Sequence, residues 1–364
     1  MERFTGQDLG QDPHIAVLFY DAIGDFIAIT PLLRGLREKY PRCAIDYFSG
    51  EQTSEIEEAS PLIDSRCSVF GRPAGLREVY DFVARRERET GPYDLAINCD
   101  FNEVLSLVTT ILQPRFVMGN CYFPHARALM PIPDNRIDNI HGEIWAPDSF
   151  LARYSDILKT NFIGEIFCRL ARLETDFQRT ETPIAPVPGP IPPVLIATGT
   201  KRRAKLWPIA YWERLIGLCT GVGIEVGLLG AKPADQARHY HAADSDAYLL
   251  ARTKLVDLRG KFTLPEVGGA LQQAKACVTI DNGIMHLSVA AGTRTLALFG
   301  ASPWKLWAPR VSHLEALLPE TPCSLCEENR FRNEDCLLPQ HLCMESIFPE
   351  RVSQRLREIV RSGK

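Results

Sequence analysis

The residues with the clearest chemical meaning follow an apolar run at 277–281, CVTID, after which a glycine and a helix of small residues begin at once. Asp281 or Asn282 is placed to cap this helix. The unpaired N–H groups from Gly283 to Met285 and the positive end of the helix dipole would hold an anion such as a diphosphate. The segment therefore predicts a phosphate site, and either Asp281 or Asn282 could also reach a ribose or sugar hydroxyl.

His286 lies in the first turn of the same predicted helix, where the dipole is expected to lower its pKa. A ligand contact and a hydrogen-bonded structural histidine are both consistent with this position.

The loop ATGTKRRAKLWP at 197–208 is a second segment suited to phosphate, because it follows another strand and carries four cations. Lys205 and the hydroxyls of Thr198 and Thr200 would neutralise the charge that builds on a leaving nucleotide diphosphate. A solvated basic loop is the alternative. The cations are Lys201, Arg202, Arg203 and Lys205.

Asp25 is the candidate general base. It follows the apolar run HIAVLFY at 14–20 by a few residues and opens an amphipathic stretch, so it is expected at the carboxyl edge of a sheet. The alternative is that Asp25, or Asp21, only caps the helix.

Four cysteines near the end of the chain are spaced C-x2-C-x9-C-x6-C. Four thiolates within 21 residues can close a tetrahedral site, and both zinc and iron accept such ligands. Because the protein would supply every ligand, this ion would be structural. Reduced cysteines without metal are the alternative. The predicted ligands are Cys323, Cys326, Cys336 and Cys343.

Short apolar runs alternate with helical stretches along the whole chain, which predicts doubly wound α/β sheets. Six prolines among the eleven residues PIAPVPGPIPP exclude a helix or a central strand there and indicate a linker. The predicted parts are an N-terminal domain at 1–182, the linker at 183–193, a C-terminal domain at 194–345 and a C-terminal helix at 346–364.

Composition and missing motifs exclude several classes of protein. Lys and Arg number 41 against 45 Asp and Glu, so nucleic-acid binding is not expected. The loop after the first strand holds only Gly24, and no P-loop or G-x-S-x-G elbow is present, which counts against dinucleotide oxidoreductases, nucleoside triphosphatases and α/β hydrolases. No apolar run approaches about 20 residues and the N-terminus is polar, so a cytoplasmic location is expected.

Two long motifs together resemble the family 9 glycosyltransferases, whose best-known members are ADP-heptose:lipopolysaccharide heptosyltransferases. They are IGDFIAITPLLRGLR at 23–37 and IDNGIMHLSVAAGTRTLALFGASPWKLWAP at 280–309. The resemblance extends to KLWP at 205–208, to DLRGKFTLPE at 257–266 and to the cysteine-rich tail ending in CMESIFPERV.

The resemblance implies a GT-B fold, with two Rossmann-like domains facing a cleft and a C-terminal helix that packs back on the N-terminal domain. It implies an inverting transfer in which an acceptor hydroxyl, deprotonated by Asp25, displaces ADP without a catalytic metal. Lys205 matches the lysine beside the donor phosphates, and Asp281 the aspartate at the nucleotide-sugar helix. Lipopolysaccharide core is the commonest acceptor of the family; a protein, another glycan or a small metabolite stays open, as does a peripheral contact with the inner membrane.

The chain departs from the family pattern at two places. The usual D-S-G-P-M-H reads DNGIMH, with Asn282 and Ile284 changed, and Lys232 stands where some relatives have an acidic residue near the ribose. Two alternatives to a transferase are a nucleotide-sugar epimerase of the same architecture and a metal-bearing scaffold whose transferase site has decayed.

Overall fold

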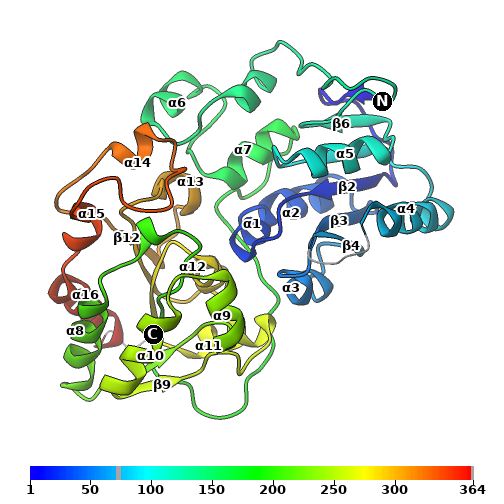
Figure 1. Cartoon of the computed structure of the whole chain (residues 1–364). Coiled ribbons are helices and arrows are strands. Elements are labelled where there is room, and N and C mark those ends of the chain that lie inside the picture. Colours follow the sequence, from blue (N-terminus) through cyan, green and yellow to red (C-terminus); the bar gives the residue numbers. More distant parts are fainter. Residues whose placement is uncertain (71–74, 362–364) are drawn as a thin grey trace. The chain divides into compact units, whose positions relative to one another are not determined.

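The computed structural model describes residues 1–70 and 75–361, and the chain divides into two compact units at residues 1–183 and 184–364. Within the described residues, each unit contains one six-stranded sheet whose neighbouring strands are all parallel. Helices cover the sheets (Figure 1). The prediction of two doubly wound α/β sheets is therefore confirmed.

The N-terminal sheet is built around β2, whose five residues are all buried. Across the sheet the strands are β1 (Glu2–Arg3), β6 (Phe116–Met118), β5 (Leu95–Asn98), β2 (His14–Leu18), β3 (Ala44–Gly50) and β4 (Ser65–Phe70). The helices are α1 (Ile23–Ala28), α2 (Thr30–Lys39), α3 (Ser54–Glu58), α4 (Leu76–Thr90), α5 (Glu103–Ile111), η1 (Asp138–Gly142), α6 (Asp148–Arg153) and α7 (Ile163–Leu170).

The amphipathic stretch after β2 forms two helices rather than one. Helix α1 ends at Ala28 and α2 begins at Thr30, with Pro31 in its first turn. A proline is tolerated there because its missing N–H would have no partner within the helix. This break leaves Asp25 on a short helix of its own directly after β2.

The C-terminal sheet has the strand order β12 (Leu314–Leu317), β11 (Thr295–Leu298), β10 (Ala276–Ile280), β7 (Val194–Ala197), β8 (Val226–Leu228) and β9 (Leu255–Asp257). The helices are η2 (Arg203–Lys205), α8 (Ile209–Thr220), α9 (Pro233–His239), α10 (Ala243–Arg252), α11 (Leu264–Gln273), α12 (Gly283–Ala290), α13 (Trp304–Trp307), α14 (Leu325–Glu328), α15 (Leu342–Glu345) and α16 (Pro349–Arg361).

Helix α16 packs within the C-terminal unit, against α8 and β10. Its residues Val352 and Leu356 are fully buried in the hydrophobic core that these elements share. The packing of this helix on the N-terminal domain, which the resemblance implies, stays a prediction.

The proline-rich residues 183–193 form neither helix nor strand. The amide of Ala185 donates to the carbonyl oxygen of Pro265 at 2.9 Å, which ties this segment to the start of α11. Among the described residues, no helix is both long and apolar enough to cross a membrane.

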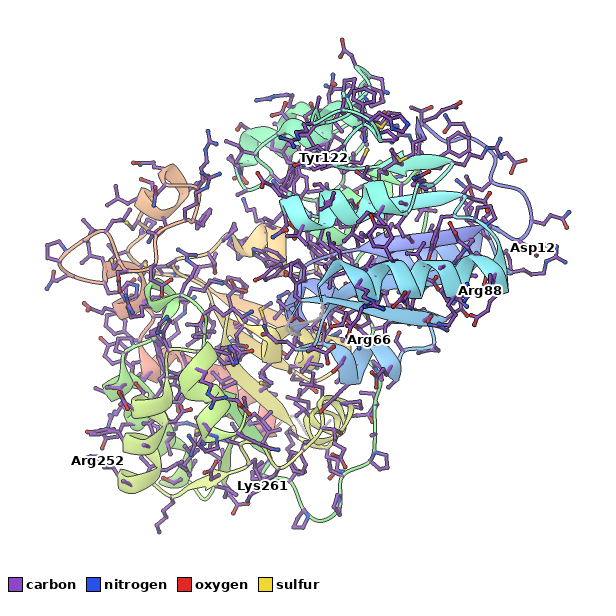
Figure 2. All side chains as sticks on the ribbon, turned by 45° about the vertical axis from the view of Figure 1, so that its right-hand side comes forward. Asp12, Arg66, Arg88, Tyr122, Arg252 and Lys261 are labelled. Carbon is purple, nitrogen blue, oxygen red and sulfur yellow. The ribbon has the colours of Figure 1, made fainter. Side chains whose placement is uncertain are left out.

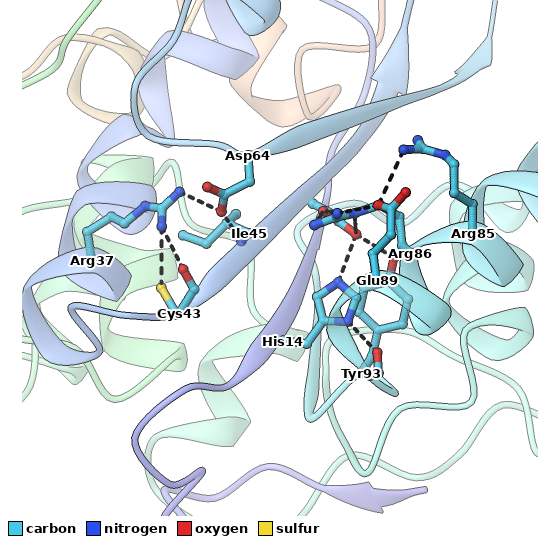
Figure 3. A network of polar contacts seen from close by, with 11 residues as sticks. His14, Arg37, Cys43, Ile45, Asp64, Arg85, Arg86, Glu89 and Tyr93 are labelled. Atoms are coloured by element: carbon cyan, nitrogen blue, oxygen red, sulfur yellow. Dashed lines mark hydrogen bonds and ion pairs between the residues drawn. The ribbon is translucent and has the colours of Figure 1, made fainter.

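A buried polar network joins the amino ends of β2 and β3 to α4 (Figure 3). Asp46 accepts hydrogen bonds from His14, Tyr93 and Arg86 at 2.7 to 3.0 Å. Burial alone would raise the pKa of Asp46, but the hydrogen bonds from these three partners outweigh burial and lower it. The carboxylate is thus held ionised in the interior, where an unpaired charge would be costly.

We expect Asp46→Asn to lower the free energy of unfolding at pH 7 by about 3–5 kcal/mol, since it leaves buried donors without their anion. The folded pKa of Asp46 lies below its unfolded value of about 3.9, so the contribution is present above that pH and is lost as the pH falls through the folded pKa. Urea unfolding at pH 7 and at pH 3 measures both effects.

The matched control is Asp12→Asn, because Asp12 is exposed in the loop before β2 and forms a solvated ion pair with Arg42 (Figure 2). A small effect is expected there. Equal effects of the two substitutions at pH 7 would contradict the structural role of the network.

Candidate functional site

Each sheet has one place where the strand order reverses, and open α/β sheets bind ligands at the carboxyl ends of the strands there. In the C-terminal sheet this place lies between β7 and β10, which are paired. The loop at 198–208, here the β7–α8 loop, leaves one strand, and Asp281 and α12 follow the other. The two segments singled out from the sequence therefore meet at the same edge of the C-terminal sheet.

Lys205 and Asp281 form an ion pair at this edge. The ammonium nitrogen of Lys205 lies 2.6 Å from Oδ2 of Asp281. The Asp281 side chain is 6% exposed and that of Lys205 is 20% exposed, so the pair is largely shielded from water. Such a charge-assisted hydrogen bond fixes the position of the lysine nitrogen relative to the start of α12.

The electrostatics of the pair are set by burial and by its neighbours. Burial would raise the pKa of Asp281, but the nearby Lys205 and His286 and hydrogen bonds that include Ser302 lower it. Burial lowers the pKa of His286 to about 4, and Lys205 acts in the same direction. His286 is therefore neutral at physiological pH; the direction agrees with the sequence analysis, but burial is the main cause.

Asn282 is the cap of α12, which settles the choice between Asp281 and Asn282. Its Oδ1 accepts the backbone N–H of Met285 at 3.0 Å, and its Nδ2 donates to the carbonyl oxygen of Gly199 at 2.9 Å. The cap thus joins α12 to the β7–α8 loop. The N–H of Met285 was expected to face a ligand, but it is paired with the cap.

Two predicted hydroxyls have protein partners in this structure. Thr198 donates to the buried carboxylate of Asp246, while the hydroxyl of Thr200 accepts the backbone N–H of Arg202 at 3.4 Å. A cavity of about 350 Å³ borders Thr198. The structure therefore brings Lys205, Asp281, Asn282 and His286 together, whereas the hydroxyl of Thr198 is engaged by Asp246.

The cations of the β7–α8 loop do not act as one phosphate-binding set. Arg202 donates to the carbonyl oxygens of Asn333 and Ala301 at 2.9 and 3.1 Å, and Arg203 pairs with Asp335 at 2.6 Å. These arginines hold protein rather than project toward a ligand. The sequence analysis named Arg202 only as one of the loop cations, and it missed both the structural role of Arg202 and the hydrogen bond from Ser302 to Asp281, because the partners are distant along the chain.

In the N-terminal unit, the strand order reverses between β2 and β5, and Asp25 follows β2 in the first turn of α1. Asp25 is partly buried, and the N-cap of α1 is Ala22. Neither aspartate is therefore this cap. Asp21 is buried and accepts hydrogen bonds from the amide of Gln52 and the hydroxyl of Thr53 at 2.9 and 3.2 Å.

The four tail cysteines do not form the predicted metal site. Burial raises the pKa of the Cys343 thiol to about 11, and the charges of the other three cysteines act in the same direction. Across residues 1–70 and 75–361, however, no group of three or more His, Cys, Asp or Glu is arranged to hold a metal ion. The sulfur of Cys326 instead accepts a hydrogen bond from Asn333, and the thiol of Cys336 donates to the carbonyl oxygen of Gln340.

Comparisons with known proteins agree with this architecture. Residues 167–336 match the profile of glycosyltransferase family 9 (heptosyltransferase). Lipopolysaccharide heptosyltransferase 3 of Escherichia coli K12 is 21% identical over 79% of this chain and 82% of its own.

Solved structures show the same fold at low identity. The family 9 glycosyltransferase of Veillonella parvula gives a TM-score of 0.69 at 18% identity, covering 97% of this chain and 99% of its own. The E. coli ADP-heptose lipopolysaccharide heptosyltransferase II gives 0.66 at 16% identity, covering 96% and 99%. The fold of this chain is thus of the GT-B type.

We expect His286 to remain neutral down to about pH 4 in a histidine NMR titration. Asp281→Asn should lower this midpoint further, because it removes the negative charge that favours the imidazolium. The signal is assigned by its loss in His286→Gln.

His141, in the N-terminal unit, is the matched control. Burial also lowers its pKa to about 4, and its charged neighbours are Arg3 and Asp138. Its midpoint should not respond to Asp281→Asn. A His286 midpoint near 6.5, or an equal response of both histidines, would refute the assigned environment.

Proposed function

The chain belongs to glycosyltransferase family 9, and from this premise we propose that it transfers a heptose or a related sugar from a nucleotide diphosphate donor to an acceptor hydroxyl. The part of this proposal that concerns donor binding rests on the Lys205–Asp281 ion pair beside the start of α12. ADP-heptose is the proposed donor, because the structurally similar E. coli enzyme is described as an ADP-heptose enzyme.

The proposed donor site uses groups that the fold already holds in place. A lysine ammonium has three N–H donors, and the one directed at Asp281 leaves two for the diphosphate oxygens. The positive end of the α12 dipole adds to this attraction. Asp281 would accept a hydrogen bond from a ribose or sugar hydroxyl while Lys205 keeps it ionised.

The proposed chemistry is a single displacement with inversion. Asp25 accepts the proton of the acceptor hydroxyl, whose oxygen then bonds to the anomeric carbon as the bond to the diphosphate oxygen breaks. Lys205 and the α12 dipole stabilise the negative charge that develops on the departing ADP. The proposed steps use no catalytic cofactor. A structural zinc or iron ion forms no part of the proposal, because the tail cysteines are not arranged as ligands.

For the acceptor we propose a chemical class rather than a single molecule. A glycan such as lipopolysaccharide core is the first candidate, since the relative named for that acceptor aligns over most of the chain, at 21% identity. A protein or a small metabolite is the second candidate. We place the reaction in the cytoplasm, with a peripheral contact at the inner membrane as a further element of the proposal.

Purified protein, ADP-heptose and a panel of glycan, peptide and small-molecule acceptors test the proposal through the release of ADP. Acceptor-dependent release supports transfer. An epimerase would convert the sugar without releasing ADP, and a scaffold with a decayed site would do neither.

We expect Asp25→Asn to lower turnover by about 10²–10⁴-fold, the usual contribution of a general base, while ADP binding to the C-terminal unit is retained. Turnover and calorimetric ADP binding are measured on the same preparation. Asp81→Asn, an exposed position on α4, is the matched control and should leave turnover unchanged. Wild-type turnover in Asp25→Asn would remove Asp25 from the reaction.

We expect Lys205→Met to weaken ADP binding by about 10- to 100-fold, because a charge-assisted hydrogen bond to the diphosphate is lost. The control is Lys261→Met, at an exposed loop position after β9 (Figure 2). Binding is measured by calorimetry at constant ionic strength. Equal affinities in the two variants would show that Lys205 makes no contact with the diphosphate.

A further inference from the structure

The cysteine-rich tail, residues 323–343, contacts the β7–α8 loop. Cys326 and Cys343 are buried in the core of the C-terminal unit, and Phe331 packs against the same core. The chain turns at Arg330 and Phe331, whose φ values of 52° and 54° are uncommon for residues other than glycine. This turn directs the following segment, residues 333–341, which we call the strap, toward the loop.

The strap holds both backbone groups of Ala204, the residue before Lys205. The N–H of Ala204 donates to the carbonyl oxygen of Glu334 at 2.8 Å, and the carbonyl oxygen of Ala204 contacts Nε2 of His341 at 2.7 Å. Ala204 itself is fully buried. The backbone that carries Lys205 is therefore fixed by residues about 130 positions further along the chain.

Arg202 and Asn333 form the second attachment. Nε of Arg202 donates to the carbonyl oxygen of Asn333 at 2.9 Å, and Nη2 lies 3.3 Å from its Oδ1. Asn333 is 7% exposed, and its Nδ2 donates to the carbonyl oxygen of Asp335 at 2.7 Å. Oδ1 of Asn333 thus joins the strap to the loop, while its Nδ2 holds the backbone of the strap and the sulfur of Cys326.

The same guanidinium reaches the segment that supports Asp281. Nη1 of Arg202 donates to the carbonyl oxygen of Ala301, the residue before Ser302, and Ser302 hydrogen-bonds Asp281. The strap, the loop and the Asp281 segment therefore meet at one arginine. The loop needs such support, because its regular structure is the single turn η2.

We propose that the strap, acting through Asn333 and Arg202, positions Lys205 for the diphosphate of the nucleotide-sugar donor; this inference rests on the function proposed above. Asn333 and Arg202 are positioning residues, since their polar atoms are directed at protein groups. The exposed pair of Arg203 and Asp335 adds little, because ion pairs in water are weak.

The test compares Asn333→Ala, Arg202→Lys and the double variant with Asn329→Ala, an exposed asparagine on the same tail. We expect each of the first two to raise the Kd of ADP and the KM of the donor by about 10-fold, with kcat changed less. The effects of the two substitutions should not add in the double variant, because both loosen the attachment between Arg202 and Asn333. Asn329→Ala should bind as the wild type does.

Amide hydrogen exchange provides a readout that needs no ligand. The Ala204 amide is bonded to the strap, so Asn333→Ala should speed its exchange at least 10-fold relative to Asn329→Ala. If the wild-type protein binds no ADP, the proposed function fails, and the role of the strap is then tested by exchange alone. Faster exchange of the Ala204 amide in Asn333→Ala supports the attachment of the loop by the strap, and unchanged exchange overturns it.

Two further outcomes would overturn the proposal. Weakened ADP binding in Arg202→Lys with normal binding in Asn333→Ala would make Arg202 a direct phosphate ligand. A lower melting temperature in Asn333→Ala, with unchanged KM and unchanged Ala204 exchange, would show that the strap stabilises the fold without positioning Lys205.

Discussion

The ion pair of Lys205 and Asp281 is the interaction on which the candidate donor site depends. The apolar strand β10 ends at Ile280, so the next side chain lies at the carboxyl edge with little access to water. A carboxylate in such a place is kept ionised by a nearby cation and by hydrogen bonds, and Lys205 supplies the cation from 76 residues earlier in the chain. The position of the β7–α8 loop is therefore a condition for the charge state of Asp281.

That condition explains why so much of the loop is bound to other segments. Asn282 holds the carbonyl oxygen of Gly199, the backbone of Ala204 is held by the tail, and Arg202 spans two further carbonyl oxygens. A loop with one short turn has little internal hydrogen bonding, so these external bonds replace it. The cysteine-rich tail is thereby explained as a support for the donor site, a role that its spacing alone does not suggest.

The sequence was enough to predict a structural feature where the residues that determine it are neighbours in the chain. An apolar run, an aspartate and a glycine predict a strand end and a helix start, and the structure has Asp281 and α12 there. It was insufficient where a partner is distant: Thr198 bonds Asp246, 48 residues away, and Arg202 bonds Asn333, 131 residues away. A count of cations could not separate the roles of Lys205 and Arg202, because the roles depend on the partners: the carboxylate of Asp281 for Lys205 and backbone carbonyl oxygens for Arg202. The same limit applies to the cysteines, whose spacing says nothing of Asn333 and Gln340.

The two aspartates after β2 follow the same logic in the N-terminal unit. Asp21 lies so close to Gly50 that a Cβ there would meet its carboxyl group at 2.3 Å, and it accepts the amide of Gln52. These hydrogen bonds to the Asp21 carboxylate join the end of β2 to the turn between β3 and α3. Four residues on, Asp25 stands in the first turn of α1 at the point where the strand order reverses. In each unit, then, one polar residue at the carboxyl edge holds the backbone while another stands at the place where an open α/β sheet binds its ligand.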